Sequence, residues 1–226
     1  MKIVVAFEGM DGAGKTSLGL YAKQLCGECA CPFTIIGRRE AYSSPLVGRL
    51  TRLLHEEPMT LSPSAETFVR LAREQERGCL ASRVPDGVVV LDRFVLSMLA
   101  LARLNGQDTE PIKRLLREIT LRAQLVATVL VTCPFEIARA RVKERLQGAK
   151  VKRSRDERFL HRLADFMEED FRSGLLTGQQ WPVDNSLALE AAEEQLAAYL
   201  APYIKKSSST TRAEEATPAL GTPVAP

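Results

Sequence analysis

Residues 9–16 read Gly9-Met10-Asp11-Gly12-Ala13-Gly14-Lys15-Thr16, and this stretch decides the fold. It matches the spacing G-x-x-x-x-G-K-[ST] of a loop that joins a strand to a helix and cradles phosphate groups. The flanking sequence fits, because the apolar run Lys2–Phe7 precedes the loop and a helical pattern, Thr16–Leu25, follows it. The sequence therefore predicts a phosphate-binding loop after a buried first strand.

The residue types of this loop suit the binding of ATP. Glycines permit positive-φ turns and a close approach of backbone N–H groups to the anion. The helix that follows adds unsatisfied N–H groups and the positive end of its dipole. We expect Lys15 to bridge the β- and γ-phosphates and the Thr16 hydroxyl to bind Mg²⁺. The residues predicted to bind the donor nucleotide here are Gly9, Met10, Asp11, Gly12, Ala13, Gly14, Lys15, Thr16 and Ser17.

Strand and helix patterns alternate along the rest of the chain. Continuous aliphatic runs such as Val88–Leu91 are typical of strands covered on both faces. The alternation predicts an α/β fold, a single-domain P-loop NTPase with a doubly wound five-stranded parallel sheet and helices on both faces. The predicted strands are Lys2–Phe7, Phe33–Ile36, Val88–Leu91, Val126–Thr132 and Gln180–Val183; the predicted helices are Thr16–Leu25, Ser44–Leu54, Ser64–Leu80, Leu96–Leu104, Pro111–Gln124, Phe135–Leu146, Asp156–Leu176 and Ala188–Ile204.

Composition limits the classes of protein that remain. The 226 residues, 45% apolar and 26% charged, suit one domain over residues 1–205. Residues 206–226 are rich in Ser, Thr, Ala and Pro, and we expect a disordered tail there. A net charge of +3 argues against nucleic acid or membrane as the main partner. Because no apolar run reaches the ~20 residues needed to cross a bilayer, we expect a cytoplasmic protein.

A second candidate site follows the third predicted strand. Val88–Leu91 leads directly into Asp92 and Arg93, and open parallel sheets bind ligands at the carboxyl ends of their strands. Asp92 fits a ligand of Mg²⁺ or of its waters, with a turn or capping residue as the alternative. Arg93 offers a planar fork for a phosphate, with a solvated turn residue as the alternative. We expect both side chains to act in catalysis.

A basic segment covers residues 139–158, with nine Lys or Arg and three acidic residues. An arginine can stabilise the charge of a phosphoryl-transfer transition state, and the loop at residues 9–16 contains none. We expect a helical lid here, with Arg145 and Arg153 as the candidate catalytic arginines. For Arg139 and Lys143 we favour a solvated helix face. Gly148 gives the lid a flexible point for closing over ATP.

The cluster Cys26-x-x-Cys29-x-Cys31 is similar to part of a zinc site. A tetrahedral zinc site needs a fourth ligand, however, and the other Cys and His residues lie far along the chain. We therefore favour reduced thiols in a turn between a helix and a strand.

Several motifs resemble the thymidylate kinase family. The stretch Phe7-Glu8-Gly9-Met10-Asp11-Gly12-Ala13-Gly14-Lys15-Thr16 looks like that family's start, and Asp92-Arg93-Phe94-x-x-Ser97 resembles its D-R-Y-x-x-S. The weaker matches are Gly37-Arg38-Arg39-Glu40 with T-R-E-P, Ser64-Ala65-Glu66-x-Phe68 with A-E-x-x-L-F, Phe135-Glu136-Ile137-Ala138 plus Arg141 and Arg145 with P-E-x-x-L-x-R-x-x-x-R, and Val183-Asp184-Asn185 with I-D-A. The similarity spans Lys2 to about Ile204.

The resemblance implies roles for individual residues. Arg39 and Arg93 would hold the acceptor's phosphate, with Ser97 beside them, and Asp11 would approach the sugar hydroxyl. Phe68 would stack on the acceptor base, while Asp184 and Asn185 would lie near the donor adenine. Members of the family commonly form homodimers, so we expect one here, through the helices Ser64–Leu80 and Leu96–Leu104.

The region expected around the acceptor base departs from the family pattern. Where the family has L-F-x-x-D-R, the chain reads Val69-Arg70-Leu71-Ala72-Arg73-Glu74. After Ser97, Ala100 and Leu101 stand where an aromatic residue and Gln are usual. The motifs that handle phosphate are kept, whereas those that would read thymine are altered.

We therefore expect ATP-dependent phosphorylation of a nucleoside monophosphate, dTMP by default, with Mg²⁺. A monophosphate has a second pKa of about 6, so the acceptor needs no strong general base. One alternative is a nucleoside or other small-molecule kinase of the same fold, with Asp92 as the base. Another is a nucleotide-binding regulator without phosphotransfer, which the basic lid and the Asp92-Arg93 pair disfavour.

Overall fold

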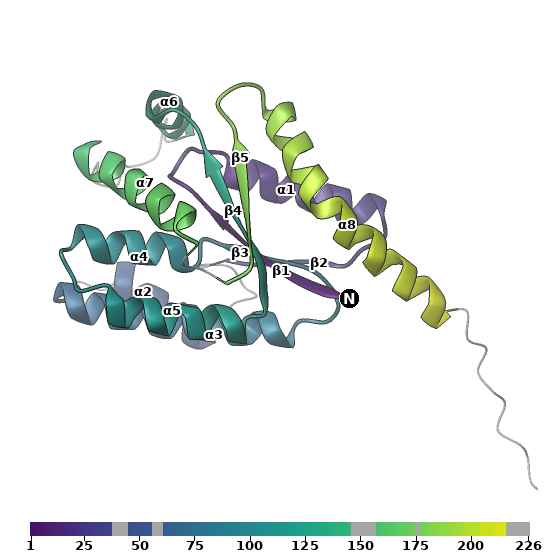
Figure 1. Cartoon of the computed structure of the whole chain (residues 1–226), viewed down its shortest axis with the longest axis horizontal. Helices are drawn as coiled ribbons and strands as arrows, with labels where there is room; N and C mark the ends of the chain where they lie inside the picture. Colours follow the sequence, from purple (N-terminus) through teal and green to yellow (C-terminus); the bar gives the residue numbers. More distant parts are fainter. Residues whose placement is uncertain (38–44, 56–60, 146–156, 175–176, 216–226) are drawn as a thin grey trace, which may run out of the picture.

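The five strands form one parallel sheet with the order β2-β3-β1-β4-β5 (Figure 1). A computed structural model describes residues 1–37, 45–55, 61–145, 157–174 and 177–215. The strands are β1 (Lys2–Glu8), β2 (Phe33–Ile36), β3 (Gly87–Asp92), β4 (Leu125–Thr132) and β5 (Gln179–Asp184). Each lies within about one residue of its predicted range, and every neighbouring pair is parallel. The predicted sheet is confirmed.

Helices cover both faces of this sheet (Figure 1). On one face lie α1 (Lys15–Glu28) and α8 (Leu189–Glu215). On the other lie α2 (Pro45–His55), α3 (Pro63–Arg83), α4 (Val95–Leu104), α5 (Glu110–Arg122) and α7 (Glu157–Arg172), and α6 (Phe135–Arg145) follows β4. This arrangement is the predicted P-loop NTPase fold.

Side chains of β1 alternate between two hydrophobic cores. Val5 and Phe7 belong to the core that contains residues of α1 and α8. Val4 and Ala6 belong to the core that contains residues of α4 and α5. This alternation follows from the two-residue period of a strand, and it explains why β1 is apolar almost throughout. The fully covered strand fixes the position of the loop that follows it.

The carboxyl ends of the central strands coincide. In the β1–β3 ladder Phe7 pairs with Asp92, and in the β1–β4 ladder Glu8 pairs with Leu130. The Arg93 N–H continues the first ladder by donating to the Phe7 carbonyl at 2.9 Å. The loop at residues 9–16 and the Asp92-Arg93 pair therefore leave the same edge of the sheet.

The last helix is longer than expected. The sequence predicts Ala188–Ile204 and a disordered tail from residue 206, whereas α8 runs to Glu215. Residues 216–226 lie outside the described part of the chain, and the disordered tail stays a prediction. The segment has no Gly or Pro between residues 203 and 215, so each residue adds to a helix that is already nucleated, at little cost.

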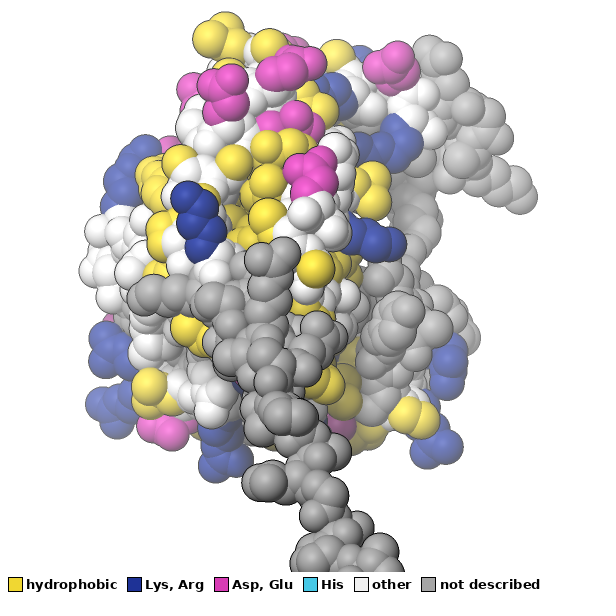
Figure 2. Space-filling view, turned by 90° about the vertical axis from the view of Figure 1, so that its right-hand side faces the viewer, with side chains coloured by type: hydrophobic (Ala, Val, Ile, Leu, Met, Phe, Trp, Pro, Cys, Tyr) yellow, Lys and Arg dark blue, Asp and Glu magenta, His cyan; other side chains and the backbone are white. Residues whose placement is uncertain are grey.

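The side of the molecule on which α8 ends carries both signs of charge. Figure 2 shows acidic side chains gathered at the top of this face and Lys and Arg side chains around its margins. Neither sign dominates this view. In the described ranges, no helix combines the length and apolar character needed to cross a bilayer.

Candidate functional site

The loop at residues 9–16 takes a conformation that requires glycine. Gly12 and Gly14 have φ angles of 86° and 103°, in the left-handed region. A Cβ at Gly12 would lie 2.1 Å from the Ala138 carbonyl oxygen, and one at Gly14 would lie 2.1 Å from Asn185 Nδ2. Neither position could accept another residue without displacing backbone or a buried amide. The loop therefore fits tightly against α6 and the segment after β5.

Lys15 lies over the start of this loop. Its Nζ donates to the carbonyl oxygens of Gly9 at 3.0 Å and Met10 at 2.7 Å. The pKa of Lys15 is lowered to about 7, chiefly by burial and in part by Arg93, while the carboxylates of Asp11, Asp92 and Glu8 oppose the shift. An arriving phosphate would favour the charged form of this amine.

Thr16 and Asp92 line a common hollow of about 110 Å³ beside Lys15. Together they offer a hydroxyl and a carboxylate oxygen, the hard donors that Mg²⁺ prefers. Mg²⁺ usually takes one or two protein ligands and completes its shell with water and phosphate oxygens. The residues present therefore fit this ion. Within the described ranges no group of three or more His, Cys, Asp or Glu is placed to hold a metal.

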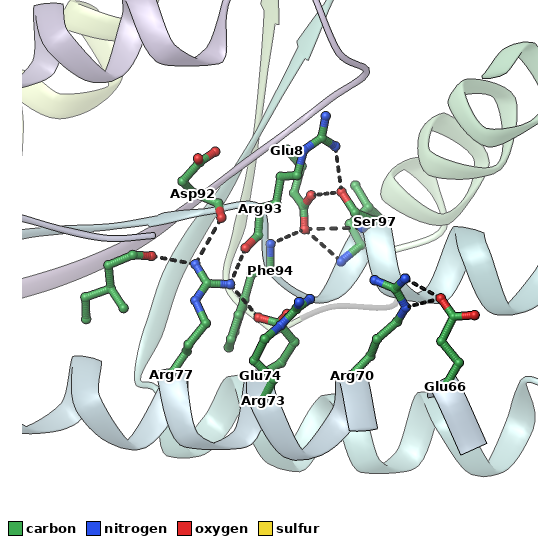
Figure 3. A network of polar contacts seen from close by, with 12 residues as sticks. Glu8, Glu66, Arg70, Arg73, Glu74, Arg77, Asp92, Arg93, Phe94 and Ser97 are labelled. Carbon is green, nitrogen blue, oxygen red and sulfur yellow. Dashed lines mark hydrogen bonds and ion pairs between the residues drawn. The ribbon is translucent and has the colours of Figure 1, made fainter. Parts of the chain in front are cut away.

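Arg93 connects the phosphate loop to the start of α4. Its guanidinium donates to the Asp11 carboxylate and, at 3.2 Å, to the Ser97 hydroxyl. Its φ of 53° is left-handed, a rare conformation for a residue other than glycine. Three predicted acceptor residues, Asp11, Arg93 and Ser97, are thus brought together, and the Arg93–Ser97 contact is drawn in Figure 3.

Glu8 is a functional candidate that the sequence analysis missed. Its side chain is fully buried, and Oε1 accepts N–H groups from Phe94 at 2.9 Å, Leu96 at 2.9 Å and Ser97 at 3.3 Å. Its Oε2 accepts the Ser97 hydroxyl (Figure 3). Glu8, the last residue of β1, therefore caps the amino end of α4, the helix that follows the neighbouring strand β3. An acidic residue that ends an otherwise apolar strand is the signal that could have indicated it.

The altered family motif lies on α3 as a chain of ion pairs (Figure 3). Arg70 pairs with Glu66, one turn away. Arg73 donates to Glu74 Oε1 from Nε at 2.9 Å and from Nη2 at 2.7 Å, and both side chains are fully buried. Burial lowers the pKa of the Arg73 guanidinium, which the Glu74 carboxylate opposes. These charges therefore bind one another instead of facing solvent.

On the donor side, Asn185 holds the phosphate loop. Its Nδ2 donates to the Ala13 carbonyl at 2.7 Å, and its own carbonyl accepts from Arg141 Nη2 at 3.4 Å. Asn185 Oδ1 and Arg141 Nη1 are both buried without a hydrogen-bond partner in the described structure. Asp184 accepts the Ser186 N–H at 2.9 Å, at the end of β5. Arg141, which the sequence analysis quoted only as part of a motif, thus joins Asn185 at this side of the site.

Four further predicted site residues are Arg39, Phe68, Arg145 and Arg153. Arg39 and Arg153 lie outside the described residues. Arg145 is exposed at the end of α6, and Phe68 on α3 is 67% exposed. Arg139 forms an ion pair with Glu157, which joins α6 to α7.

Taken together, the loop, its half-buried lysine and the Asp92-Arg93 pair at the neighbouring strand end define a P-loop kinase. Comparison with known proteins agrees, because the sequence model of the thymidylate kinase family matches residues 7–177. The thymidylate kinase of Mycoplasma pneumoniae is 30% identical over 185 residues, which cover 78% of this chain and 87% of that protein. The thymidylate kinase of a Janthinobacterium species is 27% identical over 200 residues, covering 87% and 95%. A probable thymidylate kinase of Archaeoglobus fulgidus is 27% identical over 144 residues, covering 63% and 70%.

The chain belongs to the thymidylate kinase family. It is accordingly a phosphotransferase with ATP as the phosphate donor.

Proposed function

We propose that this protein transfers the γ-phosphoryl group of ATP to a nucleoside monophosphate, with dTMP as the default acceptor. The observation that carries the proposal is the contact of Arg93 with both Asp11 and Ser97. The Arg93 guanidinium, which would bind the acceptor's phosphate, lies beside the loop that would hold the donor. Donor and acceptor would then meet at the joined ends of β1 and β3.

The chain's own residues supply binding and charge. Lys15 would contact the β- and γ-phosphates, and its pKa of about 7 would rise as the phosphates bind. Thr16 and Asp92 would hold Mg²⁺, which supplies charge neutralisation at the phosphates when bound. Arg93 would align the acceptor's phosphate, and Arg39 is proposed to share this role. Catalysis would come from positioning and electrostatic stabilisation.

Further roles remain proposals on the same basis. The lid arginines Arg145 and Arg153 would stabilise the transferring group. Asp184 and Asn185 would lie near the donor adenine, which the bond from Asn185 to the phosphate loop supports. Phe68 would contact the acceptor base.

A nucleoside or other small-molecule kinase is the second candidate. The observation that favours it is the ion-paired chain on α3, where Arg70, Arg73 and Glu74 replace the residues expected to read thymine. The exposed Asp92 carboxylate beside Lys15 would then serve as a base for a neutral hydroxyl.

A single screen separates these functions. ADP release is measured with ATP, Mg²⁺ and each nucleoside monophosphate in turn, then with each nucleoside. Preferential turnover of dTMP supports the proposal. Turnover of nucleosides alone would overturn it, and ATP binding without any acceptor turnover would indicate a regulator.

We also propose a homodimer. The apolar side chains of α4, such as Leu96 and Leu99, are buried inside the chain, so this helix offers little surface for pairing. The better candidates are the exposed Leu46 on α2 and Leu115 on α5. Sedimentation velocity of the wild type and of Leu115→Glu tests this. A cytoplasmic location stays a prediction.

A further inference from the structure

Arg77 is a buried arginine whose bonds go to the backbone of the site. Its side chain is fully buried and pairs with Glu74 on the same helix. One carboxylate oxygen of Glu74 binds Arg77, and the other binds Arg73. From Nη1 Arg77 donates to Glu74 Oε2 and, at 2.5 Å, to the Arg93 carbonyl oxygen. From Nη2 it donates to the carbonyl oxygens of Ile36 at 2.5 Å and Asp92 at 3.0 Å (Figure 3). One guanidinium thus joins α3 to the ends of two strands.

Two of the three carbonyl groups that Arg77 binds belong to the last residues of strands. Ile36 is the last residue of β2 and Asp92 the last residue of β3. No strand residue follows either of them, so these oxygens need another donor if they are buried. The planar, forked guanidinium can serve several acceptors at fixed angles, which a lysine amine cannot do in the same way.

Arg93 is held by its backbone on both sides. Its N–H donates to Phe7, the neighbour of Asp92 across the ladder, and its carbonyl accepts from Arg77. Between these two bonds the residue takes its left-handed φ of 53°. Such a conformation persists only where surrounding contacts fix it. The direction in which the Arg93 side chain leaves the backbone depends on that conformation.

We propose that Arg77 is a positioning residue for the acceptor: it fixes the backbone of Arg93 so that the guanidinium points to Asp11, Ser97 and the acceptor's phosphate. This inference rests on the proposed acceptor role of Arg93. Arg77 itself touches no substrate. The contacts that hold the phosphate loop do not involve Arg77, because Lys15 bonds to Gly9 and Met10, and Asn185 bonds to Ala13. Arg77 binds Asp92 only at its backbone carbonyl, not at the carboxylate proposed to hold Mg²⁺.

The test is a double-mutant cycle between Arg77 and Arg93. In the wild-type background, Arg77→Lys should lower acceptor kcat/KM about tenfold while ATP KM changes less than about twofold. In the Arg93→Ala background, the same change should alter acceptor kcat/KM by less than about twofold, because the side chain that it positions is gone. Equal losses in the two backgrounds, or a parallel rise in ATP KM, would show a purely structural role.

Two controls keep this test decisive. Arg103→Lys is the matched control, because Arg103 also binds two acidic residues, Glu169 and Asp170, yet neither of these bonds reaches a backbone carbonyl of the site. If Arg77→Lys folds poorly, Arg77→Gln takes its place, because Glu74 keeps its ion pair with Arg73 and is not left as a lone buried carboxylate. The same cycle is then run with that variant.

A second measurement separates this inference from the proposed function. Amide hydrogen exchange of Arg93 reports its bond to Phe7 without any substrate. Exchange at Arg93 should be faster in Arg77→Lys than in the wild type and in Arg103→Lys. If no monophosphate is turned over but this rate rises, the proposed function fails and the positioning role stands. An unchanged rate contradicts the positioning role.

Discussion

Replacing Glu8 with Gln should destabilise the protein strongly. The carboxylate is fully buried and accepts N–H groups of Phe94, Leu96 and Ser97 together with the Ser97 hydroxyl. Glutamine keeps one carbonyl oxygen at this place but loses the negative charge. It also directs an NH₂ group toward one of the groups that Glu8 now accepts from.

The magnitude follows from these contacts. A hydrogen bond to a charged group contributes about 1.5–3 kcal/mol, against about 0.5–1.5 kcal/mol for a neutral one. The difference, about 1 kcal/mol for each of the four contacts, predicts a loss of about 4 kcal/mol, to which the lost charge at the amino end of α4 adds. In a protein of this size, about 2–4 °C of Tm accompany each kcal/mol, so Tm should fall by about 8–16 °C or more.

Urea unfolding and a thermal scan measure this effect. The control is Asp86→Asn, since Asp86 pairs with the chain's amino group at an exposed position. That control should change the free energy of unfolding by less than about 0.5 kcal/mol. If Glu8→Gln also stays within about 0.5 kcal/mol of the wild type, the cap contributes little and the reasoning is refuted.

Other predictions concern phosphate handling. Lys15→Ala should lower turnover at least ~100-fold with an unchanged far-UV spectrum, and near-normal turnover would contradict the role of Lys15. Arg93→Ala should cost roughly 1.5–3 kcal/mol in acceptor kcat/KM and leave ATP affinity unchanged; steady-state kinetics in both substrates decides this, and a fall in ATP affinity alone would refute it. ATP binding at pH 8 should take up protons, because Lys15, with a pKa of about 7, is mostly neutral in the free protein and charged beside phosphate. Calorimetry in buffers of different ionisation enthalpy measures that uptake, and a value of zero at pH 8 would contradict it; uptake should disappear at pH 5.5, where Lys15 is already charged.

Sequence patterns predicted those parts of the site that depend on local spacing. The P-loop follows from residues 9–16, and Asp92 and Arg93 follow from an apolar strand that stops at a charged pair. Both lie at the predicted edge of the sheet because parallel strands carry their carboxyl ends on one side.

Contacts between distant residues could not be predicted in the same way. Glu74 and Arg77 have the i,i+3 spacing of an ordinary ion pair on a solvated helix. Charged residues such as these and the adjacent Arg73 are usually exposed. Their complete burial depends on which helix face meets the sheet, and this is a property of the packed structure. The bond from Asn185 to Ala13 is likewise invisible in a linear motif. Residue patterns therefore predicted the loop at residues 9–16, but not the distant side chains that hold the site in place.

The chain separations of these contacts predict an order of assembly. Glu8 bonds to the start of α4 across 86 to 89 residues of the chain. Glu8, Asp11, Arg93 and Ser97, the proposed acceptor region, are therefore all present once residue 97 has been synthesised. The clamp of Asn185 on Ala13 closes a loop of 172 residues. Contacts that close longer loops lose more chain entropy and form later on average. A nascent chain should thus form the proposed acceptor region well before the bond from Asn185 to Ala13. Ribosome-bound chains from which β5 has not yet emerged should therefore fold in part but bind ATP weakly.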